Sequence, residues 1–211
     1  MSETAASIMF VHGAWHGGWC FAGVAAALEA RGHEVEAVDL PCDRPGLTVQ
    51  DYAATVGPRP RSVVVGHSLG ALSVALVDAQ TRVYLAPVLP VENAYDECFA
   101  QGFGGYVRDE LGRSYWPDAD TCAAKMYPDC TRERSDWAFA RLRRQAPLDA
   151  IVAPLGPGDV VIATCRDTAV DFEWQVRAGR AHGARVVELD TGHSPFFTHP
   201  QELAGLLVRL A

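Results

Sequence analysis

The sequence around Ser68 constrains the fold of this 211-residue chain more than any other feature does. The motif Gly-His-Ser-Leu-Gly at residues 66–70 directly follows an apolar run at 63–65 and directly precedes a stretch of helical period. A serine between two glycines at such a junction is typical of a sharp, strained turn from a strand into a helix, which lifts the hydroxyl above the sheet edge. Side chains in place of the glycines would collide with the neighbouring strand or helix. The motif therefore predicts Ser68 as a nucleophile; the alternative is a chance match in which Ser68 only caps a helix.

Short apolar runs alternate with longer alanine-rich stretches of helical period along the rest of the chain. This alternation predicts an α/β fold, in which strand-helix-strand units build a parallel sheet. Six strands are expected, at residues 7–12, 34–39, 62–66, 82–86, 159–165 and 185–189. Helices are expected at residues 19–31, 69–78, 171–182 and 201–210. The length suits one domain, which can bury roughly 70% of the surface that its unfolded chain exposes.

Residues 91–147 interrupt this alternation. They hold nine of the nineteen aromatic residues and lack the alternating pattern of strands. They follow the fourth predicted strand, and ligands of open α/β sheets bind outside the carboxyl ends of the strands. We therefore expect a cap insertion over a ligand site, with Trp116 and Trp137 in contact with the substrate. Packing of the aromatic residues on one another is the alternative interpretation.

A serine hydroxyl is a poor nucleophile unless a base removes its proton, so a histidine is needed at the same edge of the sheet. His193 follows the predicted strand at 185–189, and Gly192 and Pro195 force a loop around it. We interpret the other histidines outside the glycine-rich loop and the serine motif, His33, His182 and His199, as surface or packed residues. His193 is the predicted general base.

The base in turn needs a carboxylate that fixes its tautomer. The usual chain order is serine, acid, histidine, and four aspartates lie between the start of the predicted strand at 159–165 and His193. Asp167 comes just past the end of the predicted strand at 159–165 and is therefore favoured. The alternatives are Asp159 at the other end of that strand, Asp171 at the start of the next helix, and Asp190 in the histidine loop.

Catalysis also needs hydrogen-bond donors where negative charge develops on an acyl oxygen. The backbone N–H of Leu69 supplies one at a helix N-terminus, and we expect the second from Ala14, in the glycine-rich loop at 12–19. Gly13 lets the backbone of this loop approach the substrate, and Gly13 and Trp15 are predicted to contact it.

Two further histidines in this loop, His12 and His16, invite comparison with a metal site. No carboxylate or cysteine in the loop completes a set of ligands, so we predict neither a metal nor a cofactor.

Charge and cysteine usage restrict the partners and the compartment. The chain has 18 basic and 26 acidic residues, and its formal net charge of −8 repels nucleic acid and anionic lipid surfaces. The six cysteines form no C-x-x-C pair, and the first residues lack the basic and apolar regions of a signal peptide. No apolar run approaches the ~18 residues that span a bilayer. We expect a cytoplasmic protein without nucleic-acid or membrane partners; its oligomeric state stays open, a homodimer included.

Several longer runs resemble one known family: FVHGAWHGGWCF, VVVGHSLGA, VYLAPVLP and ELDTGHSPFFTHPQEL, and more weakly KMYPDCTRERSDWAFARLRRQAP. They are similar to the α/β-hydrolases that include plant methylesterases, hydroxynitrile lyases and bacterial esterases. The resemblance implies a six-stranded, mostly parallel sheet flanked by helices, with a small helical cap and no cofactor. It also implies a triad of Ser68, Asp167 and His193, with oxyanion donors at Ala14 and Leu69.

Two positions separate the branches of that family. In the lyase branch a threonine usually stands where this chain has Gly13, and a lysine follows the catalytic histidine where this chain has Ser194. Both differences favour the esterase branch.

The leading hypothesis is hydrolysis of a carboxylic ester, lactone or thioester of a small to medium hydrophobic substrate, through an acyl-enzyme on Ser68. A second hypothesis keeps the site but changes the reaction to proton transfer, with C–C cleavage, elimination or cyclisation of a polyketide-like or cyanohydrin substrate, because a fold does not dictate its chemistry. A third is a small-molecule binding protein with a vestigial triad.

Overall fold

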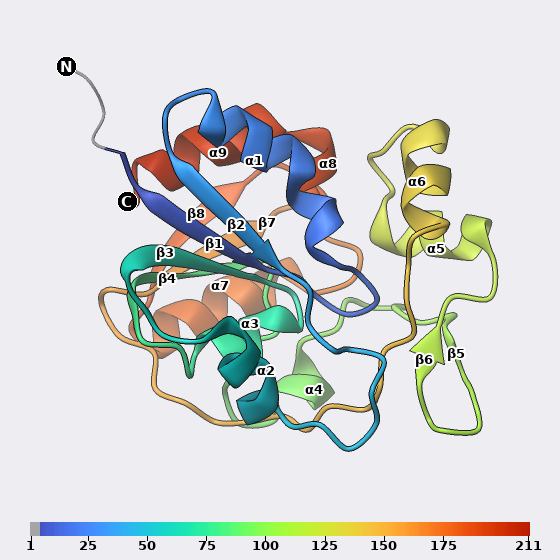
Figure 1. Ribbon diagram of the computed structural model, residues 1–211. Coiled ribbons are helices and arrows are strands. Elements are labelled where there is room, and N and C mark those ends of the chain that lie inside the picture. The colour runs from blue at the N-terminus through green and yellow to red at the C-terminus, as the bar shows by residue number, and fades with distance from the viewer. Residues whose placement is uncertain (1–4) are drawn as a thin grey trace.

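The computed structural model describes residues 5–211, and six parallel strands form its central sheet (Figure 1). The strands are β1 (Ser7–Val11), β2 (Glu34–Val38), β3 (Arg59–His67), β4 (Ala79–Leu85), β7 (Val160–Thr164) and β8 (Arg185–Leu189), in the order β2-β1-β3-β4-β7-β8. All five residues of β7 are buried, as are the last six of β3, because helices cover both faces of the sheet. The predicted α/β fold class is confirmed.

Helices pack on both faces of this sheet (Figure 1). On one face lie η1 (Gly18–Phe21), α1 (Ala22–Glu29), α8 (Pro195–Thr198) and α9 (Pro200–Val208), and on the other α2 (Val49–Val56), α3 (Gly70–Val74) and α7 (Phe172–Ala181). Each face has its own apolar core. One includes Val24 and Leu203, and the other includes Tyr52, Leu72 and Trp174.

The helix after β3 is shorter than the sequence predicts. Its alanine-rich pattern continues to residue 78, but α3 ends at Val74. After Val74 the chain turns into β4 instead of continuing the helix. At this turn the Arg82 guanidinium donates a hydrogen bond to the carbonyl of Ala75 at 2.8 Å.

The helix α2, which the sequence analysis does not predict, begins at a capping box. The Thr48 hydroxyl accepts from the backbone N–H of Asp51 at 3.2 Å, and the Asp51 carboxylate accepts from the Thr48 N–H at 2.8 Å. The local signal for this helix is therefore the pair Thr48 and Asp51, three residues apart.

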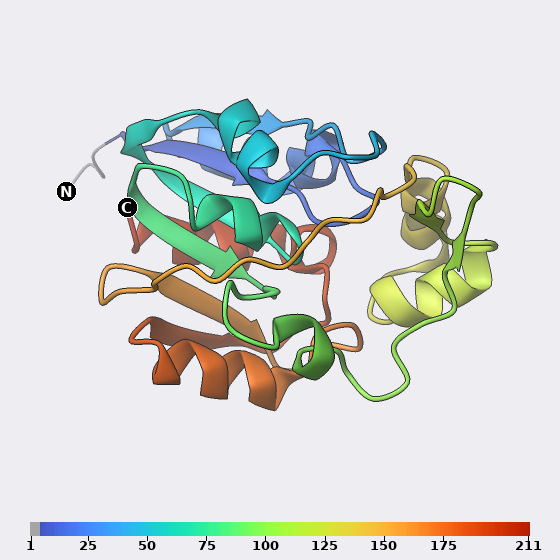
Figure 2. The same cartoon turned by 90° about the horizontal axis from the view of Figure 1, so that it is seen from below.

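Residues 91–147, called the inserted segment below, contain short elements that lie largely apart from the sheet. They are α4 (Ala94–Glu97), β5 (Val107–Arg108), β6 (Ser114–Tyr115), α5 (Ala119–Met126) and α6 (Arg132–Phe139). In Figures 1 and 2, β5, β6, α5 and α6 stand together beyond the carboxyl ends of the strands. The aromatic residues of this segment share a small apolar core with Trp15 of the loop after β1.

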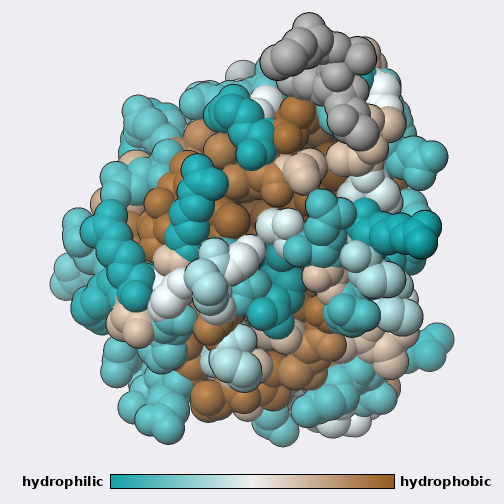
Figure 3. All heavy atoms as spheres, turned by 90° about the vertical axis from the view of Figure 1, so that its left-hand side faces the viewer, coloured by the Kyte–Doolittle hydropathy of each residue, from teal (hydrophilic) through white to brown (hydrophobic). Residues whose placement is uncertain are grey.

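The opposite end of the molecule carries the amino ends of the strands and the C-terminus, and apolar side chains reach the surface there between hydrophilic ones (Figure 3). The predicted catalytic residues all follow the carboxyl ends of strands, at the end where the inserted segment stands.

Candidate active site

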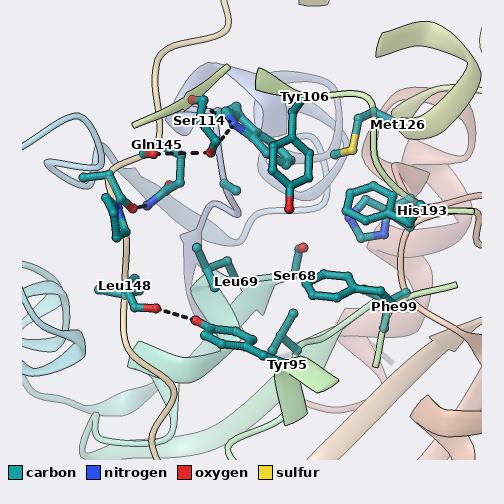
Figure 4. Close-up of a pocket in the computed structure, with 18 of the residues that line it drawn as sticks. Ser68, Leu69, Tyr95, Phe99, Tyr106, Ser114, Met126, Gln145, Leu148 and His193 are labelled. Atoms are coloured by element: carbon teal, nitrogen blue, oxygen red, sulfur yellow. Dashed lines mark hydrogen bonds between the residues drawn. The ribbon is translucent and has the colours of Figure 1, made fainter. Parts of the chain in front are cut away.

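Ser68 sits on a strained turn between β3 and α3. Its φ of 50° lies in the left-handed region, which residues other than glycine rarely adopt. A side chain at Gly66 would approach Ala71 and Val74 of α3 to 2.8 and 2.7 Å, and one at Gly70 would overlap the carbonyl oxygen of His12. Both glycines are therefore required for the tight packing that holds the turn, and the Ser68 hydroxyl points into a cavity (Figure 4).

His193 and Asp167 form a buried pair beside this cavity. The distance from His193 Nδ1 to Asp167 Oδ2 is 2.9 Å, and their side chains are 1% and 0% exposed. Because the carboxylate accepts the Nδ1 proton, the lone pair of the ring lies on Nε2. No group within residues 5–211 hydrogen-bonds to this Nε2, and His193 lines the same cavity as Ser68.

Four more hydrogen bonds hold the Asp167 carboxylate. Its Oδ1 accepts from the backbone N–H groups of Ala169 and Val170 at 2.8 and 2.9 Å. Its Oδ2 accepts from Thr164 Oγ1 at 2.7 Å and from Gln175 Nε2 at 3.2 Å. Sequence reasoning missed Thr164 and Gln175, because nothing local in the chain indicates that they meet this carboxylate.

The other three aspartates have different partners. Asp159, at the amino end of β7, forms an ion pair with Arg82 at 2.7 Å, and Asp171 caps α7 by accepting from the Trp174 N–H at 2.7 Å. Asp190 is 81% exposed and pairs with an arginine on the surface. Of the four candidates, only Asp167 contacts the histidine.

The loop after β1 lies against Ser68, and Arg143 and His12 hold it in place. His12 Nδ1 donates to the carbonyl of Gly13 at 2.8 Å, and its Nε2 accepts from the Leu40 N–H at 2.9 Å. Arg143 Nη2 donates to the carbonyls of His16 and Leu40 at 2.8 and 3.1 Å. These bonds position the loop that brings Ala14 to the cavity, which Leu69 also lines.

Two further buried histidines tie the catalytic loops together. His16 Nδ1 donates to the Ala14 carbonyl, and its Nε2 accepts from the Tyr127 hydroxyl, both at 2.8 Å. His67 Nε2 donates to the His193 carbonyl at 3.0 Å. Within residues 5–211 no group of three or more histidine, cysteine, aspartate or glutamate side chains could hold a metal ion.

Burial keeps these histidines neutral. It lowers the pKa of His12 to about 4 and that of His16 to about 3, and it lowers the pKa of His67 well below 6.5. In the unfolded chain they protonate near 6.5. Between these values the unfolded chain binds more protons than the folded protein, so acidification favours unfolding.

We therefore expect the free energy of unfolding to fall as the pH drops from about 6.5 towards 4, by about 1.4 kcal/mol per pH unit for each such histidine. Urea unfolding at several pH values in this range measures the slope. His16→Gln should reduce the slope by one histidine's share, because it removes one of these three buried imidazoles. A His16→Gln slope equal to that of the wild type would contradict the expectation.

The cavity beside Ser68 has a volume of about 420 Å³. Aromatic side chains make up much of its wall: Trp15, Tyr95, Phe99, Phe103 and Tyr106. The Tyr106 hydroxyl points into it from the inserted segment (Figure 4).

Of the residues predicted to contact the substrate, some lie at the cavity and others do not. Trp15 lines the cavity, and Gly13 packs directly against Ser68, where a Cβ atom would lie 2.8 Å from the serine Cβ. Trp116 lies behind the wall, with its ring 5.2 Å from that of Trp15, and is not among the lining residues. Trp137 is also not among them, because its indole packs 5.3 Å from Trp19 and under the guanidinium of an arginine.

Polar lining residues that sequence reasoning did not identify are Arg108, Ser114, Gln145 and Asp149. They belong to the inserted segment or directly follow it, where no motif indicates which side chains turn inward.

Comparisons with known proteins agree with this geometry. A family model described as the alpha/beta hydrolase family matches residues 8–206. Methylesterase 3 of Arabidopsis thaliana is 26% identical over an alignment of 258 positions, gaps included, which covers 97% of this chain and 95% of that protein. Probable esterase PIR7A of Oryza sativa subsp. indica is 36% identical over 110 residues, but the match spans only 43% of this chain and 42% of the rice protein.

Solved structures share the fold. The crystal structure of the methylesterase MES16 from Arabidopsis superimposes with a TM-score of 0.75 at 22% identity, covering 97% of this chain and 98% of that one. Polyneuridine aldehyde esterase gives a TM-score of 0.76 at 18% identity, covering 98% and 99%. The predicted resemblance to the plant methylesterase type is confirmed. Among residues 5–211, no helix is long and apolar enough to cross a membrane.

Proposed function

The chain belongs to the alpha/beta hydrolase family, and from that premise we propose that it hydrolyses a carboxylic ester through an acyl-enzyme on Ser68. One observation carries the proposal. In the buried His193–Asp167 pair, Nε2 of the histidine has no hydrogen-bond partner among the described residues and lies beside the cavity into which the Ser68 hydroxyl points.

The proposed reaction begins when His193 Nε2 takes the Ser68 proton while Ser68 Oγ attacks the acyl carbon. The resulting oxyanion accepts hydrogen bonds from the backbone N–H groups of Leu69 and Ala14. Such donors stabilise a reaction most when they point at the atom on which negative charge develops. His193 then donates its proton to the leaving alcohol, and in the second half it activates the water that releases the acid. Asp167 stays ionised throughout and stabilises the imidazolium.

The cavity supports a hydrophobic ester of small to medium size as the substrate. Its aromatic wall, with Phe99, Phe103 and Tyr106 from the inserted segment, favours aryl or alkyl groups, and its volume is typical of small-molecule sites. We propose that the inserted segment acts as a cap, because it supplies this wall above the nucleophile.

The cytoplasm is the proposed location. All six cysteines are free thiols, which a reducing compartment maintains. Burial raises the pKa of Cys42 to about 11 and that of Cys122 to about 12, so both remain protonated and unreactive.

A fluorophosphonate probe tests the proposed nucleophile, because only a serine activated by a base and an oxyanion hole reacts quickly with it. We expect one adduct per chain by intact mass within minutes, located on the peptide that contains Ser68, and accompanied by loss of activity towards p-nitrophenyl esters. Asp171→Asn should label like the wild type, since Asp171 caps α7 and does not touch His193. A folded protein that hydrolyses esters without labelling would contradict the acyl-enzyme, and one that neither labels nor hydrolyses would contradict ester hydrolysis itself.

A further inference from the structure

The side-chain amide of Gln145 is one of the polar groups in the cavity wall that have no part in the proposed hydrolysis. Gln145 is only 5% exposed and lines the cavity. Its Nε2 donates to the Ala146 carbonyl at 2.8 Å and to the Tyr52 hydroxyl at 3.3 Å. Because a carbonyl oxygen can only accept, the side-chain atom of Gln145 that contacts the Ala146 carbonyl must be the nitrogen Nε2. The oxygen Oε1 therefore points away from that carbonyl. No side chain or backbone group within residues 5–211 donates to this Oε1.

The backbone of Gln145 is fixed relative to the oxyanion loop. Gln145 and Ser114 form an antiparallel bridge, in which the N–H of each donates to the carbonyl of the other at 2.8 Å. The indole N–H of Trp15 contacts Ser114 Oγ and its carbonyl oxygen at 3.1 and 3.2 Å. Trp15 directly follows Ala14, the proposed oxyanion donor. These contacts therefore fix the position of the Gln145 backbone relative to the Ala14 N–H.

Gln145 lies on the acyl side of the nucleophile. The leaving alcohol must receive its proton from His193, so it occupies the side of the cavity next to that ring. In Figure 4, Gln145 and Ser114 lie across Ser68 from His193, beyond Leu69. A substrate in the reactive position therefore directs its acyl group towards the Gln145 amide.

We propose that Gln145 Oε1 accepts a hydrogen bond from a hydroxyl group on the acyl part of the substrate, so that the enzyme prefers hydroxylated aryl-alkanoate esters. This inference rests on the proposed ester hydrolysis. An amide oxygen whose nitrogen is committed elsewhere can only accept, which selects a donor. The indole of Trp15 and the ring of Tyr106, whose centroids are 5.6 Å apart, provide an aromatic wall for the ring that carries the hydroxyl.

The expected selectivity follows from the cost of leaving a buried acceptor unpaired. A ligand with a hydrogen atom in place of the hydroxyl covers the amide oxygen without bonding to it, and a site built to bind a hydroxyl discriminates strongly against such an analogue. We expect at least a tenfold preference in kcat/KM.

Methyl esters of phenylacetic and 3-phenylpropanoic acid, each compared with its 3-hydroxyphenyl and 4-hydroxyphenyl analogue, test this preference with a constant leaving group. For the wild type, at least one hydroxylated ester should exceed its unsubstituted parent tenfold in kcat/KM. Gln145→Met, which keeps the length but removes the amide, should bring that ratio close to one. Tyr52→Phe removes an acceptor of Nε2 but leaves Oε1 intact, so it should keep the ratio of the wild type.

The outcomes separate the two proposals. Equal wild-type hydrolysis of the parent and hydroxylated esters overturns the role of Gln145 and leaves ester hydrolysis standing. A ratio that falls as far in Tyr52→Phe as in Gln145→Met also overturns it, since the amide would then only support the wall. Absence of hydrolysis together with absence of fluorophosphonate labelling overturns ester hydrolysis itself, and the selectivity with it. Even if Gln145→Met fails to fold, a wild-type ratio near one overturns the proposal.

Discussion

Ser68→Ala is expected to lower kcat by four orders of magnitude or more while the free energy of unfolding changes little. The hydroxyl is the attacking group, and loss of a serine nucleophile in comparable triads removes nearly all turnover above the background. Within residues 5–211 no group hydrogen-bonds to Ser68 Oγ, whereas its backbone N–H donates to Leu85 and its carbonyl accepts from Ala71 and Val88 at 3.0 to 3.1 Å. The substitution keeps these backbone contacts. Steady-state kinetics on a p-nitrophenyl ester and urea unfolding measure the two effects.

Ser73→Ala provides the matched control on α3, the helix that follows the nucleophile turn. Ser73 is 1% exposed, and its hydroxyl donates to the Gly70 carbonyl at 2.8 Å. Its loss should cost about 1 kcal/mol of stability with kcat near that of the wild type, the reverse of the Ser68 result. A folded Ser68→Ala variant with more than a few per cent of the wild-type activity would favour proton transfer without an acyl-enzyme.

Asp167→Asn is expected to lower kcat by two orders of magnitude or more. The N–H groups of Ala169 and Val170 both point at Oδ1, so the amide oxygen of an asparagine takes that place and its NH₂ group takes the place of Oδ2. That NH₂ group then donates to His193 Nδ1, which moves the ring proton to Nε2. A histidine in this tautomer cannot accept the Ser68 proton, and the corresponding change in a well-studied protease costs about four orders of magnitude.

Asp171→Asn is the control, because asparagine caps a helix about as well as aspartate does. Its kcat should stay within a small factor of the wild type. Fluorophosphonate labelling rates provide a second readout, and they should fall in Asp167→Asn and not in Asp171→Asn. If Asp171→Asn were inactive and Asp167→Asn active, the acid would be assigned to the wrong residue.

Local sequence was sufficient for the strands and for the turn at the nucleophile. A run such as Val63–Val65 is stable only where both faces of a strand are covered, and all three valines are buried. The glycines at 66 and 70 are required by contacts with the helix that begins directly after them and with the adjacent strand, so the motif predicts the turn without knowledge of the remaining chain. The ends of helices were less predictable, since the alanine-rich pattern after Gly70 continues to residue 78, whereas α3 ends at Val74.

Tertiary structure alone decided which side chains meet. Asp167 and His193 are 26 positions apart, and four candidate aspartates lay in the stretch from residue 159 to His193, so only the pairing of β7 with β8 shows which carboxylate reaches the ring. The inserted segment has no period that assigns its side chains to one face, and aromatic composition alone does not distinguish Trp116 behind the wall from Phe103 in it. Gln145 carries no local signal at all. It lines the cavity, and its backbone pairs with Ser114, 31 positions earlier; contacts at that separation depend on the whole fold.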